Sequence, residues 1–161
     1  MAFGDNTLQA ARGNSQRGRN PYLVQTTLNL ATALSDKGGA LAASDVVPVI
    51  AVPKGTMILN AGIEVDTASD GSTFTVDLGM VDADVFVDGF DGTSAAAVVA
   101  QNPAAYQPVM AVADDNIDLT IASLSGGAVT TGKMRIWAVM MDCTDRGNDG
   151  TAQEVDRDTL A

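Results

Sequence analysis

The sequence has no histidine and a single cysteine, Cys143. Without histidine the chain lacks the imidazole base of Ser-His-Asp or Cys-His catalysis and the imidazole ligands of many zinc sites. One cysteine excludes an intrachain disulfide, and its position at the end of an apolar run is more typical of a small buried side chain than of a nucleophile. These absences argue against an enzyme.

Aromatic residues are scarce as well, at 4% of the chain. A core of small and β-branched side chains suits closely packed sheets, whereas ring-lined ligand pockets and sugar-binding platforms need more aromatic residues. No phosphate-binding loop is present, because Gly126-Gly127 is followed by AVTTG rather than by Lys and Ser or Thr. We therefore predict no enzymatic activity and no cofactor.

Long apolar runs are also missing. No segment reaches the 18 apolar residues of a membrane-spanning helix, and residues 1–20 lack the apolar stretch of a secretory signal. We expect no membrane partner and synthesis in a cytoplasm.

Positive charge is rare except near the N-terminus. The net charge of −11 argues against a nucleic-acid partner, since phosphates would be repelled. Residues 1–20 nevertheless hold Arg12, Arg17 and Arg19 against one Asp, which gives +2, while the remaining residues sum to −13. A basic arm on an acidic body predicts contact with an acidic neighbouring subunit, for which another copy of the protein is a candidate. A solvated terminus is the alternative.

The stretch from 46 to 91 predicts several short strands separated by turns. Ile63 and Val65 alternate with polar residues before Asp70-Gly71, and Phe74, Val76 and Leu78 do so after it. Asp-Gly is typical of a two-residue hairpin turn, so a hairpin is predicted there. A second turn is predicted at 52–55, where Pro53 precedes Gly55.

Further strands are predicted over 22–34, 116–123 and 133–143, with a weaker edge strand over 106–112 and a short helix over 92–103. A helical interpretation of 22–34 also aligns Leu23, Leu30 and Leu34. The 133–143 segment is apolar on both faces, which predicts a central strand or a face that meets another chain. We expect Ile136, Trp137 and Val139 to lie in the core or in a subunit interface, with the core favoured.

Seven to nine short strands with regular turns predict an all-β fold, an antiparallel β-sandwich of Greek-key or jelly-roll type. The predicted organisation is an extended basic arm (1–20), a sandwich domain (21–144) and a polar C-terminal tail (145–161).

Four carboxylates within ten residues form a weak candidate for a calcium site. They are Asp82, Asp84, Asp88 and Asp91. The loop has Phe86 where a third oxygen ligand is expected and no bidentate Glu follows, and turn geometry explains Asp88-Gly89 and Asp91-Gly92 equally well.

The segments VPKGTMILNAGIEVDT and TFTVDLGMVDADVFVDG, which flank Asp70-Gly71, resemble capsid decoration (cement) proteins of tailed bacteriophages, of the cyanophage or marine-phage type. YLVQTTLNL and MRIWAVMMD extend the resemblance more weakly. It implies a β-sandwich on the outer surface of the virion capsid, made in the host cytoplasm. Such a protein binds the major capsid protein, bridges neighbouring shell subunits and often forms a homo-oligomer, either a trimer or a dimer.

For this function we predict that Arg12, Arg17, Arg19 and Tyr22 contact a neighbouring subunit, with Trp137 as a further interaction candidate. Three alternatives remain open from the residues alone. They are a head- or tail-fibre or adhesin module that binds a host glycan, a stand-alone carbohydrate- or calcium-binding domain, and a hydrolase that uses acidic residues.

Overall fold

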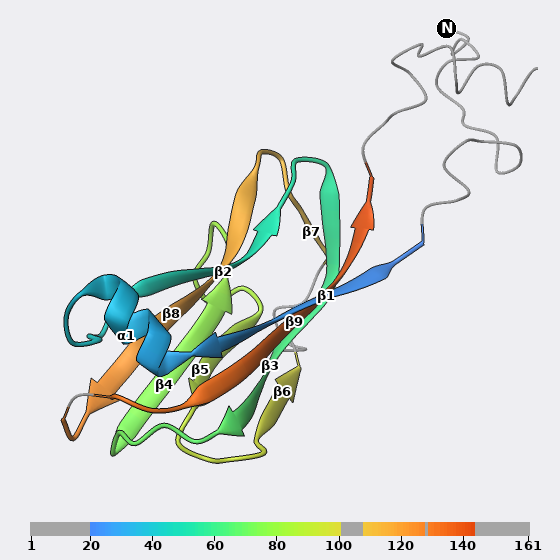
Figure 1. The fold of residues 1–161 in the computed structure, drawn as a ribbon. Helices are drawn as coiled ribbons and strands as arrows, with labels where there is room; N and C mark the ends of the chain where they lie inside the picture. Colours follow the sequence, from blue (N-terminus) through green and yellow to red (C-terminus); the bar gives the residue numbers. More distant parts are fainter. Residues whose placement is uncertain (1–19, 101–107, 128, 144–161) are drawn as a thin grey trace, which may run out of the picture.

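The computed structural model describes residues 20–100, 108–127 and 129–143. Within these residues the chain forms nine strands and one short helix, and the strands build two sheets packed face to face (Figure 1). The predicted all-β sandwich is therefore confirmed. No helix in the described part of the chain combines the length and the apolar character needed to cross a membrane.

Each sheet alternates strands from the two halves of the chain. Sheet A has the order β1 (Tyr22–Asn29), β9 (Lys133–Asp142), β3 (Thr56–Thr67), β6 (Val98–Ala100), and β7 (Val109–Met110) also pairs with β3. Sheet B has the order β2 (Val46–Val52), β8 (Asp115–Ser125), β4 (Thr73–Gly79), β5 (Val87–Asp91). All pairs are antiparallel. The first strand thus lies beside the ninth and the second beside the eighth.

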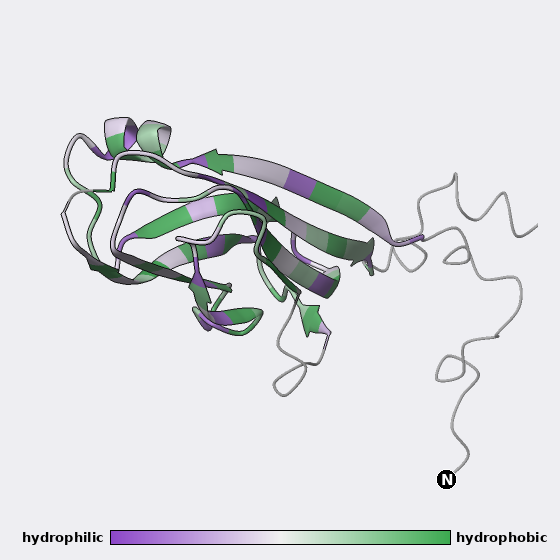
Figure 2. Cartoon of the chain, turned by 90° about the horizontal axis from the view of Figure 1, so that it is seen from below, coloured by the Kyte–Doolittle hydropathy of each residue, from purple (hydrophilic) through white to green (hydrophobic). Residues whose placement is uncertain are grey.

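The core lies between the sheets and follows the alternation expected of strands. On β9 the residues Met134, Ile136, Ala138 and Met140 are buried, while the residues between them are exposed or half-buried. The strands show this mixture of apolar and polar positions along their length in Figure 2. The predicted inward residues of β3, β4 and β8 are also buried, and each large one contributes roughly 1.5–3 kcal/mol through removal from water.

The predicted strand over 22–34 ends at Asn29, and its last part is wrong. Residues Leu30–Lys37 form α1 instead. Asn29 has extended backbone angles and its side chain accepts a hydrogen bond from the Ala31 N–H, which caps the helix. Gly38, with φ of 70°, ends it.

The predicted hairpin at Asp70-Gly71 is also wrong. β3 belongs to sheet A and β4 to sheet B, so this connection crosses from one sheet to the other. The Asp70 carboxylate accepts hydrogen bonds from Thr130 N, Thr130 Oγ1 and Thr131 N at 2.8, 2.6 and 3.1 Å. Asp70 therefore ties the β3–β4 connection to the β8–β9 connection.

The segment over 92–103 is not the predicted helix as far as the structure describes it. It turns after β5 and then forms β6, whose residues pair with β3. Two other predictions are confirmed. A turn at 53–55 is closed by a 3.1 Å hydrogen bond from Thr56 N to the Pro53 carbonyl, and the predicted edge strand includes β7. Residues 101–107, at the junction of the last two predicted segments, lie outside the described part.

Candidate interaction surface

The outer face of sheet A, directed away from the core, carries a set of large apolar side chains. Trp137, Val139 and Met141 alternate on β9 with its buried residues, and all three are half-buried without belonging to the core cluster. Strands β1, β3 and β7 add outward-facing neighbours. We call the following six residues the apolar face: Leu23, Met57, Met110, Trp137, Val139 and Met141.

Strand register makes the apolar face continuous. Leu23 on β1 lies opposite Val139 on β9. Met57 on β3 lies between Met141 on one side and Met110 on the other. Leu23 is 60% exposed although it is a large aliphatic residue in a regular strand. A contiguous apolar surface of this kind is typical of a protein–protein contact.

Gly62 provides space for the indole of Trp137. The two residues are opposite each other on β3 and β9. A Cβ atom on Gly62 would lie 2.4 Å from Cζ2 of Trp137 and 2.6 Å from the Val99 carbonyl oxygen. The indole therefore lies across bare backbone on the outside of the sheet. The favoured core assignment holds for Ile136 but is wrong for Trp137 and Val139.

One cross-strand ion pair borders the apolar face. Arg135 on β9 lies opposite Glu64 on β3, and its guanidinium donates a hydrogen bond to the Glu64 carboxylate. Both side chains remain partly exposed, so the pair is hydrated and adds little stability. The six residues of the apolar face are themselves uncharged.

The outer face of sheet B is polar. The four strands of this sheet contain five Asp residues and no Lys or Arg. Asp77 on β4 accepts a 2.7 Å hydrogen bond from Gly89 N, so this carboxylate also holds the β5 segment in place. Partial burial, with a smaller effect of the nearby Asp115, raises the pKa of Asp118. Negative charge is therefore concentrated on this side of the sandwich.

The four carboxylates of the weak calcium candidate are divided between two elements. Asp82 and Asp84 lie in the loop after β4, and a hydrogen bond between them together with their repulsion raises the pKa of Asp82. Asp91 on β5 accepts hydrogen bonds from the Thr93 backbone and hydroxyl at 2.8 and 2.7 Å, which lower its pKa. No cluster of three or more metal-ligating side chains occurs among the described residues. Turn geometry accounts for Asp91 at least.

The predicted contact residues fall in different places. Tyr22 opens β1 opposite Met140 and is 43% exposed. Trp137 lies on the apolar face. Arg12, Arg17 and Arg19 lie outside the described residues, so their predicted contact remains a prediction.

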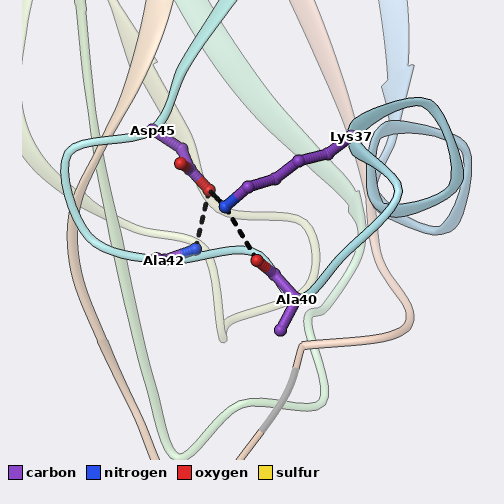
Figure 3. Close-up of polar contacts among 4 residues, drawn as sticks. All are labelled: Lys37, Ala40, Ala42 and Asp45. Atoms are coloured by element: carbon purple, nitrogen blue, oxygen red, sulfur yellow. Dashed lines mark hydrogen bonds and ion pairs between the residues drawn. The ribbon is translucent and has the colours of Figure 1, made fainter.

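A groove of about 580 Å³ lies between α1 and β2. Two of its charged lining residues, Lys37 and Asp45, are engaged in contacts that hold the loop after α1 in place. Lys37 donates to Asp45 Oδ2 and to the Ala40 carbonyl, and the Ala42 N–H donates to the same carboxylate oxygen (Figure 3). The hydrogen bond from Lys37 is the main reason why the pKa of Asp45 is lowered. These contacts fasten the loop after α1 to the end of the helix.

Sequence reasoning identified only part of the apolar face. The apolar character of both faces of 133–143 did point to Trp137, Val139 and Met141. Leu23, Met57 and Met110 were missed, because only the pairing of β1, β3 and β7 brings them beside β9.

No protein-family model and no curated protein sequence matches the chain. Its fold is similar to that of chains in solved phage capsids. One is a chain of the cyanophage Pam1 capsid asymmetric unit, with 16% identity and a TM-score of 0.57 over 87% of this chain and 97% of that chain. Another belongs to the capsid of Ralstonia phage GP4, with 15% identity and a TM-score of 0.54 over 86% of this chain and 94% of that chain. At these identities the likeness shows a shared fold.

Proposed function

We propose that the chain is a non-enzymatic structural protein of a phage virion, which decorates the outer surface of the capsid and bridges neighbouring shell subunits. One observation carries this proposal. The chain shares its fold with nearly the whole of a capsid chain from cyanophage Pam1 and of one from Ralstonia phage GP4. The agreement covers 87% and 86% of this chain, so it is not limited to one common supersecondary motif. The strand order, with the first strand beside the ninth, fits the jelly-roll type.

The two outer faces suggest how the protein is oriented. In this proposal the apolar face of sheet A is directed to the major capsid protein, since removing its six uncharged side chains from water is favourable. Sheet B is directed outward, because its Asp residues lose little when they stay hydrated. Clamping across a subunit joint needs contact area, which an apolar sheet face provides without a catalytic group. The arm of residues 1–20 adds a second contact, and neighbouring copies form a homo-oligomer on the shell.

The copy number of the chain in purified virions tests the proposal. Quantitative mass spectrometry against the major capsid protein should give a ratio of one per shell subunit or a simple fraction set by the capsid symmetry axes. A handful of copies per particle would contradict decoration and favour a fibre or adhesin that binds a host glycan. Absence from purified particles would contradict a virion role altogether.

A binding assay tests the contribution of the arm. Capsids from a phage that lacks this gene product should take up the purified chain to saturation, and deletion of residues 1–20 should weaken the uptake while the sandwich stays folded. Unchanged binding by the truncated chain would remove the arm from the proposed contact.

A further inference from the structure

An apolar pocket borders the apolar face at β7, where Met110 belongs to both. The loop after β4 and the segment from β7 to β8 enclose about 190 Å³. Its apolar lining includes Met80, Val85, Val109 and Met110. Two more lining residues, Val81 and Val112, are 93% and 79% exposed. Exposed apolar side chains gathered around a cavity are typical of docking sites.

The charge around this pocket has one sign. Its two ionisable lining residues are Asp82 and Asp115. Asp84 contacts Asp82, and Asp114 directly precedes Asp115. Asp114 accepts a hydrogen bond from the backbone N–H of Lys54 at 2.9 Å, which fixes the position of its carboxylate. An occupant should therefore combine an apolar anchor with positive charge.

The N-terminal segment has this composition. Residues 1–20 carry Arg12, Arg17 and Arg19 against one Asp, and they include Phe3 and Leu8 as large apolar side chains. The rest of the chain has a net charge of −13. Residues 119–141 also sum to +2, but their two basic residues, Lys133 and Arg135, belong to β9 of the sandwich, whereas residues 1–20 precede it.

The register of sheet A places the start of β1 near the pocket. Tyr22 lies opposite Met140, Met140 opposite Ile58, and Ile58 opposite Val109, which lines the pocket. Three strand spacings separate Tyr22 from Val109, or about 14 Å. The 19 residues before Asn20 can span up to about 60 Å when extended, which is long enough to reach the pocket of a neighbouring copy.

The chain before Asn20 and Pro21 can reach a neighbouring copy. A residue that precedes proline is restricted to extended conformations. Asn20 is therefore extended where it enters β1, and the 19 residues before it are long enough to reach a neighbouring copy.

We infer that the pocket between the β4–β5 loop and β7 receives the N-terminal segment of a second copy of this chain. Phe3 or Leu8 fills the cavity, and the arginines face Asp82, Asp84 and the Asp114-Asp115 pair. This deepens the proposed function, in which copies are neighbours on a shell, by naming the contact between them. In a closed ring each copy donates one arm and receives another.

Mixed disulfide trapping tests this inference with the full chain in solution. Two single-cysteine proteins are prepared in a Cys143→Ser background, one with Leu8→Cys and one with Val112→Cys, and mixed under mild oxidation. Docking raises the local thiol concentration to about millimolar, so the mixed disulfide should form at least about tenfold faster than between Leu8→Cys and a control, Val46→Cys. Val46, on β2, is also a largely exposed valine, at 57% against 79% for Val112. Equal rates for both pairs would overturn the inference.

Charge exchange provides a second test. Reversal of the three arginines to Glu should abolish the trapped species, and so should Asp82→Lys with Asp84→Lys. Combining the two sets should restore trapping, and no restoration would contradict the charge pairing. A chain that carries both Leu8→Cys and Val112→Cys provides a further check. If its disulfide forms only within one chain at every protein concentration, the exchange between copies is overturned. If trapping fails but the copy number on virions follows the capsid symmetry, the contact between arm and pocket is contradicted and the decoration role stands.

Discussion

The outer faces of the two sheets differ in the side chains that they present. Sheet A presents six apolar side chains, and its strands carry charges of both signs, whereas the strands of sheet B carry five Asp residues and no basic residue. The strands of both sheets have the same alternating pattern of buried residues. The formation of the strands therefore does not explain why their outward side chains differ. A face that must stay in water keeps its charges, and a face that is covered by a partner does not.

The largest expected effect comes from placing a charge on the apolar face. Val139→Glu should weaken capsid binding by about 100-fold or more, because an unpaired carboxylate buried in a contact costs several kcal/mol. The matched control is Ser123→Glu, which adds the same charge to an exposed position on β8 of sheet B. Titration of labelled protein onto capsids that lack the chain measures both. Equal losses for the two variants would contradict the assignment of the faces.

A smaller effect on capsid binding is expected when the Trp137 indole is displaced from Gly62. Gly62→Val should displace Trp137 from β3 and weaken capsid binding by about tenfold to 30-fold, since central aromatic anchors in contacts contribute about 2 kcal/mol. Trp137→Ala should have an effect of the same size, and the double variant should be no worse than either single one. Additive losses in the same titration would show that Gly62 acts independently of the ring.

Asp70 holds the two sheets in their opposed arrangement, and its removal should have a moderate effect on stability. Its three hydrogen bonds to Thr130 and Thr131 lower its pKa to about 2. A carboxyl whose folded pKa is below its unfolded value contributes stability above the unfolded pKa and loses it as pH falls through the folded one. Asp70→Ala should thus lower the Tm by a few degrees at pH 7, and thermal scans should show the difference shrinking between pH 4 and pH 2. A difference that is constant with pH would contradict the role of the charge.

The smallest effect concerns the acidic face itself. Burial raises the pKa of Asp118, so the folded state disfavours its charged form and gains relative stability as pH falls through the raised value. Asp118→Asn should raise the Tm at pH 7 by about one degree, because the group is mostly hydrated. The gain should vanish below pH 4 in the same scans, and capsid binding should not change. Loss of binding would place sheet B in the contact as well.

Alternation predicted much of the sandwich because each inward residue is specified locally. Ile63, Val65 and Phe74 follow a period of two, and burial of one sheet face is enough to fix which of them point inward. The predictions that depended on pairing partners were less successful. Asp-Gly has the conformational freedom of a hairpin turn, but the residues near Asp70 do not indicate that β3 and β4 belong to different sheets.

Two local patterns were overridden by tertiary structure. The alanines after Gly92 have high helix propensity, yet Val98 and Val99 pair with β3, and Ala96 has a φ of 61°, which no α-helix contains. The segment from Leu30 fits both the strand and the helix period. Asn29 and Gly38 favour the helix because they cap its two ends. The apolar face was half predicted for the same reason, since its β9 residues are local and the others are brought to it by pairing.

The position of the indole over Gly62 gives the protein a built-in optical reporter. Trp137 is the single tryptophan in the sequence, and it lies half-exposed on the apolar face rather than in the core. Its emission therefore reports the environment of that face alone, undiluted by other indoles. Covering the face should shift the emission to shorter wavelength and protect it from a dissolved quencher, so that attachment to a capsid can be followed in real time without a label.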